Sequence, residues 1–170
     1  MIRALALAAA TIIVAVCQAS AAPLFSVAAA TPTVVLVFLG LVALYRGETT
    51  AMVITPAVAV AEAWTRGLSP GLLLVAYVPL VPLLGAFDPR GLPLLGPGGR
   101  LLGAVAVTGA WARVLAAGSV VLAGASFAPG DIVGRLLLPG ILLDLALAGT
   151  VYGVFRVALG EPGRRSFGWR

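Results

Sequence analysis

Long apolar runs, separated by short stretches that contain glycine, proline and arginine, extend along most of the chain. A helix that crosses a bilayer needs about 20 mainly apolar residues, with a range of about 17–25. Runs of this kind occupy residues 2–20, 28–45, 49–65, 71–87, 101–127 and 132–159. The pattern therefore predicts an all-α protein of six transmembrane helices joined by short loops. Only the uncharged segment AAPLFSVA separates the first two runs, so five helices and one re-entrant segment remain an alternative.

The composition supports a membrane location. The 170 residues are 61% hydrophobic and 10% charged, and the mean hydropathy is +1.12. A typical soluble domain is about 45–50% apolar and about 25% charged. A core of this size could not bury so much apolar surface. We therefore expect an integral membrane protein with a single polytopic domain over residues 1–160 and a short tail over residues 161–170.

The basic residues predict the topology. All 11 are arginines, and six spans would place eight of them on the side that holds both termini and two on the other side, with Arg113 inside a span. Cytoplasmic loops are enriched in arginine and lysine, so we predict that both termini of this multi-pass membrane protein lie in the cytoplasm.

The same arginines bear on the partners. They occur singly between apolar runs and form no basic face with aromatic or polar side chains, which argues against nucleic acid as a partner. The tail combines arginines with Phe167 and Trp169, a combination typical of an anchor on the anionic lipids of the inner leaflet. Docking of a cytoplasmic partner is the alternative for this tail.

Three ionisable residues lie within the predicted spans. These are Glu62, Arg113 and Asp144, and such groups are costly inside a bilayer and are candidates for function. Arg113 and Asp144 fall at similar depths on consecutive antiparallel helices, so we predict an interhelical ion pair that offsets their desolvation. This helix clamp could fix the register of the helices, contact a partner's helix, or serve a substrate or a proton. Glu62 and Arg66 lie four residues apart near the outer end of their span, which predicts a polar pair on one helix face.

Glycines and prolines mark further positions. Gly149 and Gly153 form a G-x-x-x-G pattern in the last span, which predicts close helix packing within the chain or with a partner. Pro56 interrupts the third span, and Pro79 and Pro82 interrupt the fourth. Because proline removes a backbone donor, each predicts a helix kink.

Residue types that carry chemistry are scarce. The chain has one cysteine, Cys17, and no histidine, so neither a disulfide framework nor a histidine and cysteine metal site is expected within it. No nucleophile stands with a candidate base, and no phosphate-binding loop or G-x-S-x-G pattern occurs. We expect no cofactor and no catalytic activity.

The order of features resembles the rod shape-determining protein MreD family. A first span that ends in CQAS is followed by TPTVVLVFLGLVALYRGETTAMV, with a proline that opens an apolar span and an Arg-Gly turn. The segment AEAWTRGLSPGLLLVAY then places Glu62, Gly71 and Tyr77 at matching positions. The closing LLLPGILLDLALAGTVYGVFR is similar to the family's last helix. The resemblance covers nearly the whole length.

The chain departs from the family pattern at several positions. Ile54 and Val58 stand where glycines are frequent, one and two turns before the acid. Glu62 occupies a position where aspartate is usual, and Asp144 one where a polar amide is more familiar.

The resemblance implies a non-catalytic, multi-pass subunit of the bacterial cell-elongation machinery in the cytoplasmic (inner) membrane. Such a subunit would bind the membrane helix of the scaffold protein MreC and help to couple MreB filaments to the peptidoglycan synthase. The alternative is a substrate-binding S component of an energy-coupling-factor vitamin transporter, a fold to which that of MreD is thought similar. An S component needs an outward-open cavity with polar or aromatic lining, and the predicted outer loops contain few polar residues. A small structural subunit of another complex is a third possibility.

Overall fold

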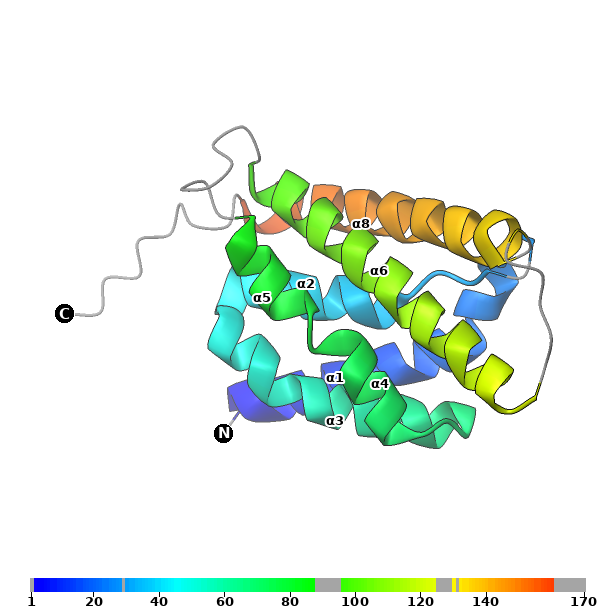
Figure 1. Ribbon diagram of the computed structural model, residues 1–170. Helices are drawn as coiled ribbons and strands as arrows, with labels where there is room; N and C mark the ends of the chain where they lie inside the picture. The colour runs from blue at the N-terminus through cyan, green and yellow to red at the C-terminus, as the bar shows by residue number, and fades with distance from the viewer. Residues whose placement is uncertain (1, 29, 88–95, 125–129, 131, 161–170) are drawn as a thin grey trace.

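The chain folds into a bundle of helices (Figure 1). The computed structural model describes all residues except 1, 29, 88–95, 125–129, 131 and 161–170. The described elements are α1 (Ile2–Ser20), the 3-10 helix η1 (Ala22–Phe25), α2 (Val34–Arg46), α3 (Glu48–Arg66), α4 (Pro70–Tyr77), α5 (Leu80–Ala86), α6 (Pro97–Leu122), the π-helical segment η2 (Ile132–Leu137) and α8 (Leu138–Leu159). Pairing of the β type in the described part is limited to an isolated bridge between Val27 and Ala30. The predicted all-α class is confirmed for these residues.

The second predicted span is shorter as a helix than the sequence indicated. Helix α2 begins at Val34, whereas the apolar run begins at residue 28. Pro32 disfavours the helical conformation at the residue before it, and Thr33, the residue that precedes the helix, has a non-helical backbone with φ −98° and ψ 83°. The described residues between η1 and α2 are therefore an irregular connection inside a stretch that hydrophobicity alone assigned to a helix.

The fourth predicted span is divided in two. Helix α4 ends at Tyr77 and α5 begins at Leu80, with Pro79 immediately before the start of α5. The predicted interruption at Pro79 is thus present as a break between two short helices. Pro82 lies inside α5 and Pro56 lies inside α3, and neither residue ends its helix.

The fifth predicted span begins earlier than expected. Residues 88–100 were predicted to form a loop, but α6 already begins at Pro97. Proline suits the first helical position because its φ angle is already helical and its missing N–H would have no partner there. Residues 88–95 of this loop, residues 125–127 of the predicted span and the predicted tail over 161–170 lie outside the described residues.

Two glycines that each follow an arginine end helices. Gly47 follows α2 with a φ of +99°, and Gly67 follows α3 with a φ of +65°. A residue with a β-carbon is strained in this region, and glycine is not. The two glycines allow the sharp turns from α2 to α3 and from α3 to α4.

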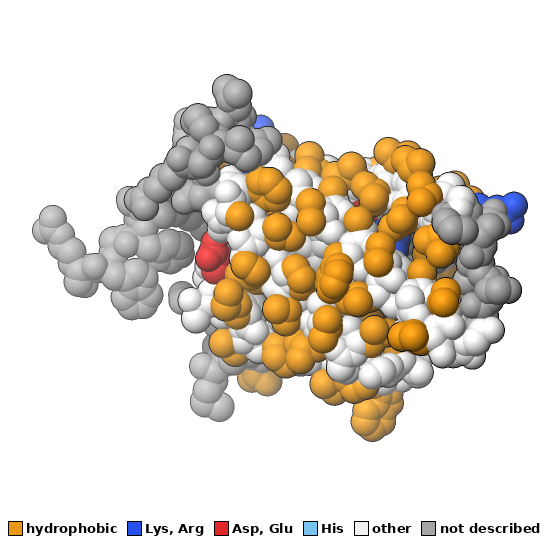
Figure 2. All heavy atoms as spheres, in the orientation of Figure 1, with side chains coloured by type: hydrophobic (Ala, Val, Ile, Leu, Met, Phe, Trp, Pro, Cys, Tyr) orange, Lys and Arg blue, Asp and Glu red, His pale blue; other side chains and the backbone are white. Residues whose placement is uncertain are grey.

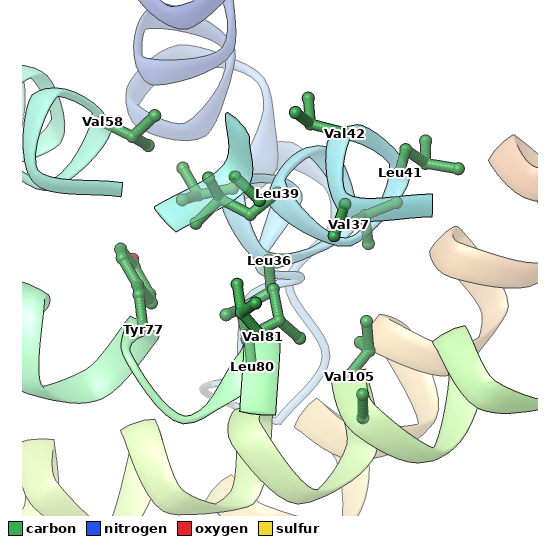
Figure 3. Close-up of a cluster of buried hydrophobic side chains, with 14 of the residues drawn as sticks. Leu36, Val37, Leu39, Leu41, Val42, Val58, Tyr77, Leu80, Val81 and Val105 are labelled. Atoms are coloured by element: carbon green, nitrogen blue, oxygen red, sulfur yellow. The ribbon is translucent and has the colours of Figure 1, made fainter. Parts of the chain in front are cut away.

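Helix α2 forms the centre of the molecule. It packs against α1, α3, α5, α6 and α8. Of its residues from Val35 to Ala43, all except Phe38 are buried. Figure 3 shows its side chains meeting those of α3, α4, α5 and α6 in one cluster, which includes Leu36, Leu39, Val58, Tyr77, Leu80, Val81 and Val105. The apolar side chains of α2 therefore connect the two sides of the bundle.

The helices alternate in direction, except that α4 and α5 together make one pass along the bundle (Figure 1). Figure 1 shows that the start of α1, the end of α2 and the end of α8 lie at one end of the bundle, whereas α1, α3 and α6 end at the opposite end. The hydroxyl of Tyr45 near the end of α2 donates a hydrogen bond to the carbonyl of Gly160 just after α8, at 3.2 Å. Two helical segments, Pro97–Leu122 and Ile132–Leu159, are long and apolar enough to cross a membrane.

Candidate functional site

An ion pair between α6 and α8 lies at the centre of the candidate site. Nη1 of Arg113 is 2.6 Å from Oδ2 of Asp144, and the side chains of the two residues are 9% and 0% exposed. The spacing of the two residues on consecutive antiparallel helices predicted such a pair, and the two charges do meet. Their mutual attraction compensates for the removal of both from solvent.

The pair also holds the backbone that leads into α2. Oδ1 of Asp144 accepts a hydrogen bond from the N–H of Thr33 at 2.6 Å. Nη2 of Arg113 donates to the carbonyl of Thr31 at 3.0 Å, and its Nη1 donates to the carbonyl of Gly109 at 3.1 Å. The ion pair therefore connects three parts of the chain, since α6 and α8 together fix the segment before α2.

Gln18 of α1 holds the same segment from another helix. Its amide nitrogen donates to the carbonyl of Pro32 at 3.1 Å, and its amide oxygen accepts from the N–H of Val34 at 2.6 Å. The first N–H groups of a helix have no partner within the helix. At the start of α2, Gln18 provides an acceptor for the N–H of Val34 and Asp144 one for the N–H of Thr33. We refer to Gln18, Arg113 and Asp144 together as the backbone clamp.

The charge of Asp144 is favourably placed. Aligned peptide dipoles give the N-terminus of a helix a partial positive charge, which stabilises a nearby carboxylate. Asp144 contacts the residue before α2 and the Arg113 guanidinium at the same time. The carboxylate therefore faces positive electrostatic potential from both, although it is buried.

Two glycines make room for the backbone clamp. A β-carbon at Gly109 would be 2.5 Å from Oδ2 of Asp144, and one at Gly140 would overlap the guanidinium of Arg113. Neither position could therefore hold a β-carbon unless the neighbouring side chain moved. The close approach of α6 and α8 at the ion pair thus depends on Gly109 and Gly140.

The predicted close packing at Gly149 and Gly153 is not found among the described residues. Both glycines are exposed. A β-carbon at Gly149 would meet only Leu102, at 4.0 Å, and one at Gly153 would meet nothing within 4 Å. These positions lie on the outward face of α8, because Asp144 and Ala148 occupy the buried face. Packing with a partner stays a prediction.

A second polar cluster lies near the end of α3. Nη1 of Arg66 is 2.6 Å from Oε1 of Glu62, as the four-residue spacing predicted. The hydroxyl of Tyr77, at the end of α4, donates a short hydrogen bond to Oε2 of Glu62. The Glu62 side chain is fully buried, whereas that of Arg66 is 37% exposed. Both oxygens of Glu62 therefore have partners, and the tyrosine links α3 to α4.

Some residues of these clusters were not identified from the sequence. Gln18 carries no charge and lies at the end of a predicted span, where a polar residue usually contacts water. Tyr77 was placed by the family resemblance but not as the partner of Glu62. The segment Thr31-Pro32-Thr33 could have indicated a role for Gln18. A proline within an apolar run leaves backbone groups that need partners elsewhere in the chain.

The chemistry available at these clusters is limited by their hydrogen bonding. Each carboxylate oxygen of Glu62 and Asp144 accepts from a donor of the chain. The described residues contain no group of three histidine, cysteine, aspartate or glutamate side chains that could hold a metal ion. Among the buried side chains described, Thr108 alone has a polar atom without a hydrogen-bond partner.

Comparisons with models of protein families, with curated proteins and with solved structures found no match for this chain.

Proposed function

We propose that the protein is a non-catalytic inner-membrane subunit of the bacterial cell-elongation, or rod-shape, complex. In this proposal it binds the membrane helix of the scaffold MreC and helps to couple MreB filaments to peptidoglycan synthesis. The proposal rests on the resemblance of its sequence to the MreD family together with the roles of its buried polar groups.

The surface supports the membrane part of the proposal. In the most apolar stretches of Pro97–Leu122 and Ile132–Leu159, only 22% and 17% of the residues are buried inside the protein. The apolar helices of a soluble protein would bury most of such a stretch, because exposed apolar patches are small on soluble monomers. Figure 2 shows hydrophobic side chains along the whole length of one face. A lipid environment accounts for this surface.

The arrangement of the described helix ends supports the predicted topology. Arg46 lies at the end of α2, Arg100 near the start of α6 and Arg156 in the last turn of α8. All three positions belong to the end of the bundle at which α1 begins (Figure 1). Arg66 of α3 and Arg135 of η2 belong to the opposite end. The end with more of these arginines is the one that the proposal places in the cytoplasm.

The observation that carries the proposal is the bonding of the buried charges. A transport or catalytic site presents charged groups to a cavity, whereas Asp144 and Arg113 bind the backbone of residues 31–33. Buried polar groups used in this way position helices relative to one another. A rigid helical surface of fixed geometry suits a protein whose task is to hold the helix of a partner.

Co-expression with the scaffold tests the proposal. The tagged chain is co-expressed with the single-span coiled-coil scaffold encoded in the same genome, and the membrane complex is isolated in mild detergent. We expect the scaffold to co-purify in a fixed ratio. A control scaffold carries an unrelated apolar helix in place of its own membrane helix and should be lost.

Two results would contradict the proposal. Equal recovery of both scaffolds, or of neither, would show that the membrane helix is not recognised. Recovery of a pair of ATPases from native membranes, with no scaffold, would identify the alternative S component of a vitamin transporter.

A further inference from the structure

The connection between α1 and α2, residues 21–33, has an unusual distribution of side chains. It contains no charged residue. Its large apolar side chains point outward, with Leu24 82% and Phe25 66% exposed, while the small residues Ala22 and Ala30 are buried. A loop in contact with water usually exposes its polar residues and buries its large apolar ones. This connection has the reverse arrangement.

The backbone of the connection is bonded largely within the protein. The N–H groups of Leu24 and Ser26 donate to the carbonyls of Ala21 and Pro23, and Val27 and Ala30 exchange hydrogen bonds at 2.9 Å. The backbone clamp binds the four residues that follow, 31–34, through two carbonyls and two N–H groups. Internal bonding of this kind is required where backbone lies in hydrocarbon, because lipid offers no partners.

The length of α2 places the end of this connection at membrane depth. Helix α2 has 13 residues and is about 20 Å long, whereas a bilayer's hydrocarbon core is about 30 Å thick. Helix α6, which packs against α2, has 26 residues and is about 39 Å long. Because α2 ends at the end of the bundle where α6 begins (Figure 1), the first turn of α2 lies well below the opposite surface.

We propose that residues 21–28 and 30–33 form a lipid-embedded cap in the outer leaflet rather than a loop in water. Leu24 and Phe25 contact acyl chains at the boundary with the headgroups. The non-helical backbone of residues 31–33 lies in the hydrocarbon region, where the backbone clamp replaces the water that would otherwise bind it. The inference rests on the membrane placement in the proposed function and is independent of binding to the scaffold.

The surroundings favour lipid over a protein partner as the occupant. Ile12, Ile13 and Val16 form an exposed apolar surface on α1 that leads directly to the connection. The connection offers no charged group that could select a partner. The apolar surface of Leu24 and Phe25 therefore continues the surface that the helices present to the bilayer.

Nitroxide accessibility tests the lipid-embedded cap. The single cysteine is first replaced by Cys17→Ser, and a spin label is attached at Phe25→Cys in the full chain. The variants are reconstituted in vesicles of phosphatidylethanolamine and phosphatidylglycerol, and collisions with oxygen and with a water-soluble nickel chelate are compared. We expect oxygen collisions to dominate at position 25.

Two labelled controls define the scale. Leu142→Cys, on an exposed position of α8, should give the oxygen-accessible signal of a lipid-facing helix, and Ser69→Cys, in the exposed turn before α4, should give the nickel-accessible signal of water. A label at Leu24→Cys repeats the measurement if Phe25→Cys does not fold.

The outcomes separate the inference from the proposed function. Nickel accessibility at position 25 equal to that at position 69 overturns the cap while the bundle remains in the membrane. Shielding of position 25 from both reagents also overturns it, because protein rather than lipid would then cover the cap. Nickel accessibility at position 142 rejects the membrane placement itself. Loss of the scaffold in the co-expression experiment changes none of these signals.

Discussion

Asp144 accepts two hydrogen bonds with different consequences. The bond from Arg113 neutralises its charge, and the bond from Thr33 fixes the backbone before α2. An ordinary buried ion pair can be replaced by apolar residues with little loss of stability. At this site such a replacement leaves the N–H of Thr33 and the carbonyl of Thr31 without partners, so the pair is not interchangeable with an apolar contact.

The ion pair leads to a prediction that distinguishes these two roles. Asp144→Asn leaves the Arg113 charge buried and uncompensated, and we expect it to lower the free energy of unfolding by about 3–5 kcal/mol. The double variant Arg113→Met/Asp144→Leu removes both charges. We expect its free energy of unfolding to remain about 2 kcal/mol or more below that of the wild type, because the N–H of Thr33 and the carbonyl of Thr31 lose their partners. Unfolding in mixed detergent micelles measures both values. Wild-type stability of the double variant would show that the backbone bonds contribute nothing.

The glycines at the ion pair give a second prediction. Gly140→Ala places a methyl group where the Arg113 guanidinium lies, so we expect the free energy of unfolding to fall by about 1–3 kcal/mol, as is typical of overpacking. Gly149→Ala on the same helix adds a methyl group whose nearest neighbour is the Leu102 side chain at 4.0 Å, an ordinary van der Waals contact. Because alanine favours a helix over glycine, we expect this control to be neutral or slightly stabilising. Equal losses in the two variants would contradict the proposed role of Gly140.

At the scale of the elements, α2 depends on other helices for its first turn. Its own preceding residue, Thr33, makes no side-chain hydrogen bond to the helix. The acceptors come instead from Gln18 of α1 and Asp144 of α8. The start of the central helix is therefore set by tertiary contacts rather than by a local capping residue.

Replacement of Gln18 tests this dependence. Gln18→Leu removes the partners of the Val34 N–H and the Pro32 carbonyl, and we expect a loss of about 1–3 kcal/mol in the free energy of unfolding. Amide hydrogen exchange should become faster at Val34. Thr11→Val is a matched control on α1, because the buried Thr11 hydroxyl bonds only to the Leu7 carbonyl of its own helix. Unchanged exchange at Val34 in Gln18→Leu would contradict capping by this residue.

The apolar runs predicted most of the elements, but the sequence predicted only part of the site. The runs gave α1 and α3 almost to the residue. Helix α3 ends at Arg66 before Gly67, and α1 ends three residues before Pro23, which cannot continue an α-helix. Helix α2 was predicted six residues too early, since residues 28–33 contain no charge that would end an apolar run and hydrophobicity does not report backbone conformation. The Arg113–Asp144 pair could be predicted because the two residues fall at similar depths on consecutive antiparallel helices. The contribution of Gln18 could not be predicted, because it depends on where the chain leaves the helical conformation.

At the scale of the whole molecule, the described helices form a bundle whose two ends differ in their number of arginines. The positions of Arg46, Arg100 and Arg156 belong to the end at which α1 begins, and those of Arg66 and Arg135 to the end where α3 finishes (Figure 1). This asymmetry determines how a bundle with an apolar surface would be oriented in a bilayer.

Reporter fusions test the orientation. A fluorescent protein fused after the last residue should mature and fluoresce, because we predict that this end lies in the cytoplasm. Alkaline phosphatase, which is active only outside the cytoplasm, should be active when fused after Leu68 in the turn between α3 and α4, and inactive after Arg46. The opposite pattern of activities would reverse the predicted topology.

The bond between Thr33 and Asp144 joins residues 111 positions apart in the chain. During synthesis, the entry to α2 emerges long before either Arg113 or Asp144 exists. Gln18 precedes this segment and can bond Pro32 and Val34 at once, whereas the carbonyl of Thr31 has its partner only after α6 is made and the N–H of Thr33 only after α8 is made. Until then, another group or water must bind the N–H of Thr33. The last helix to be made thus completes the start of the second.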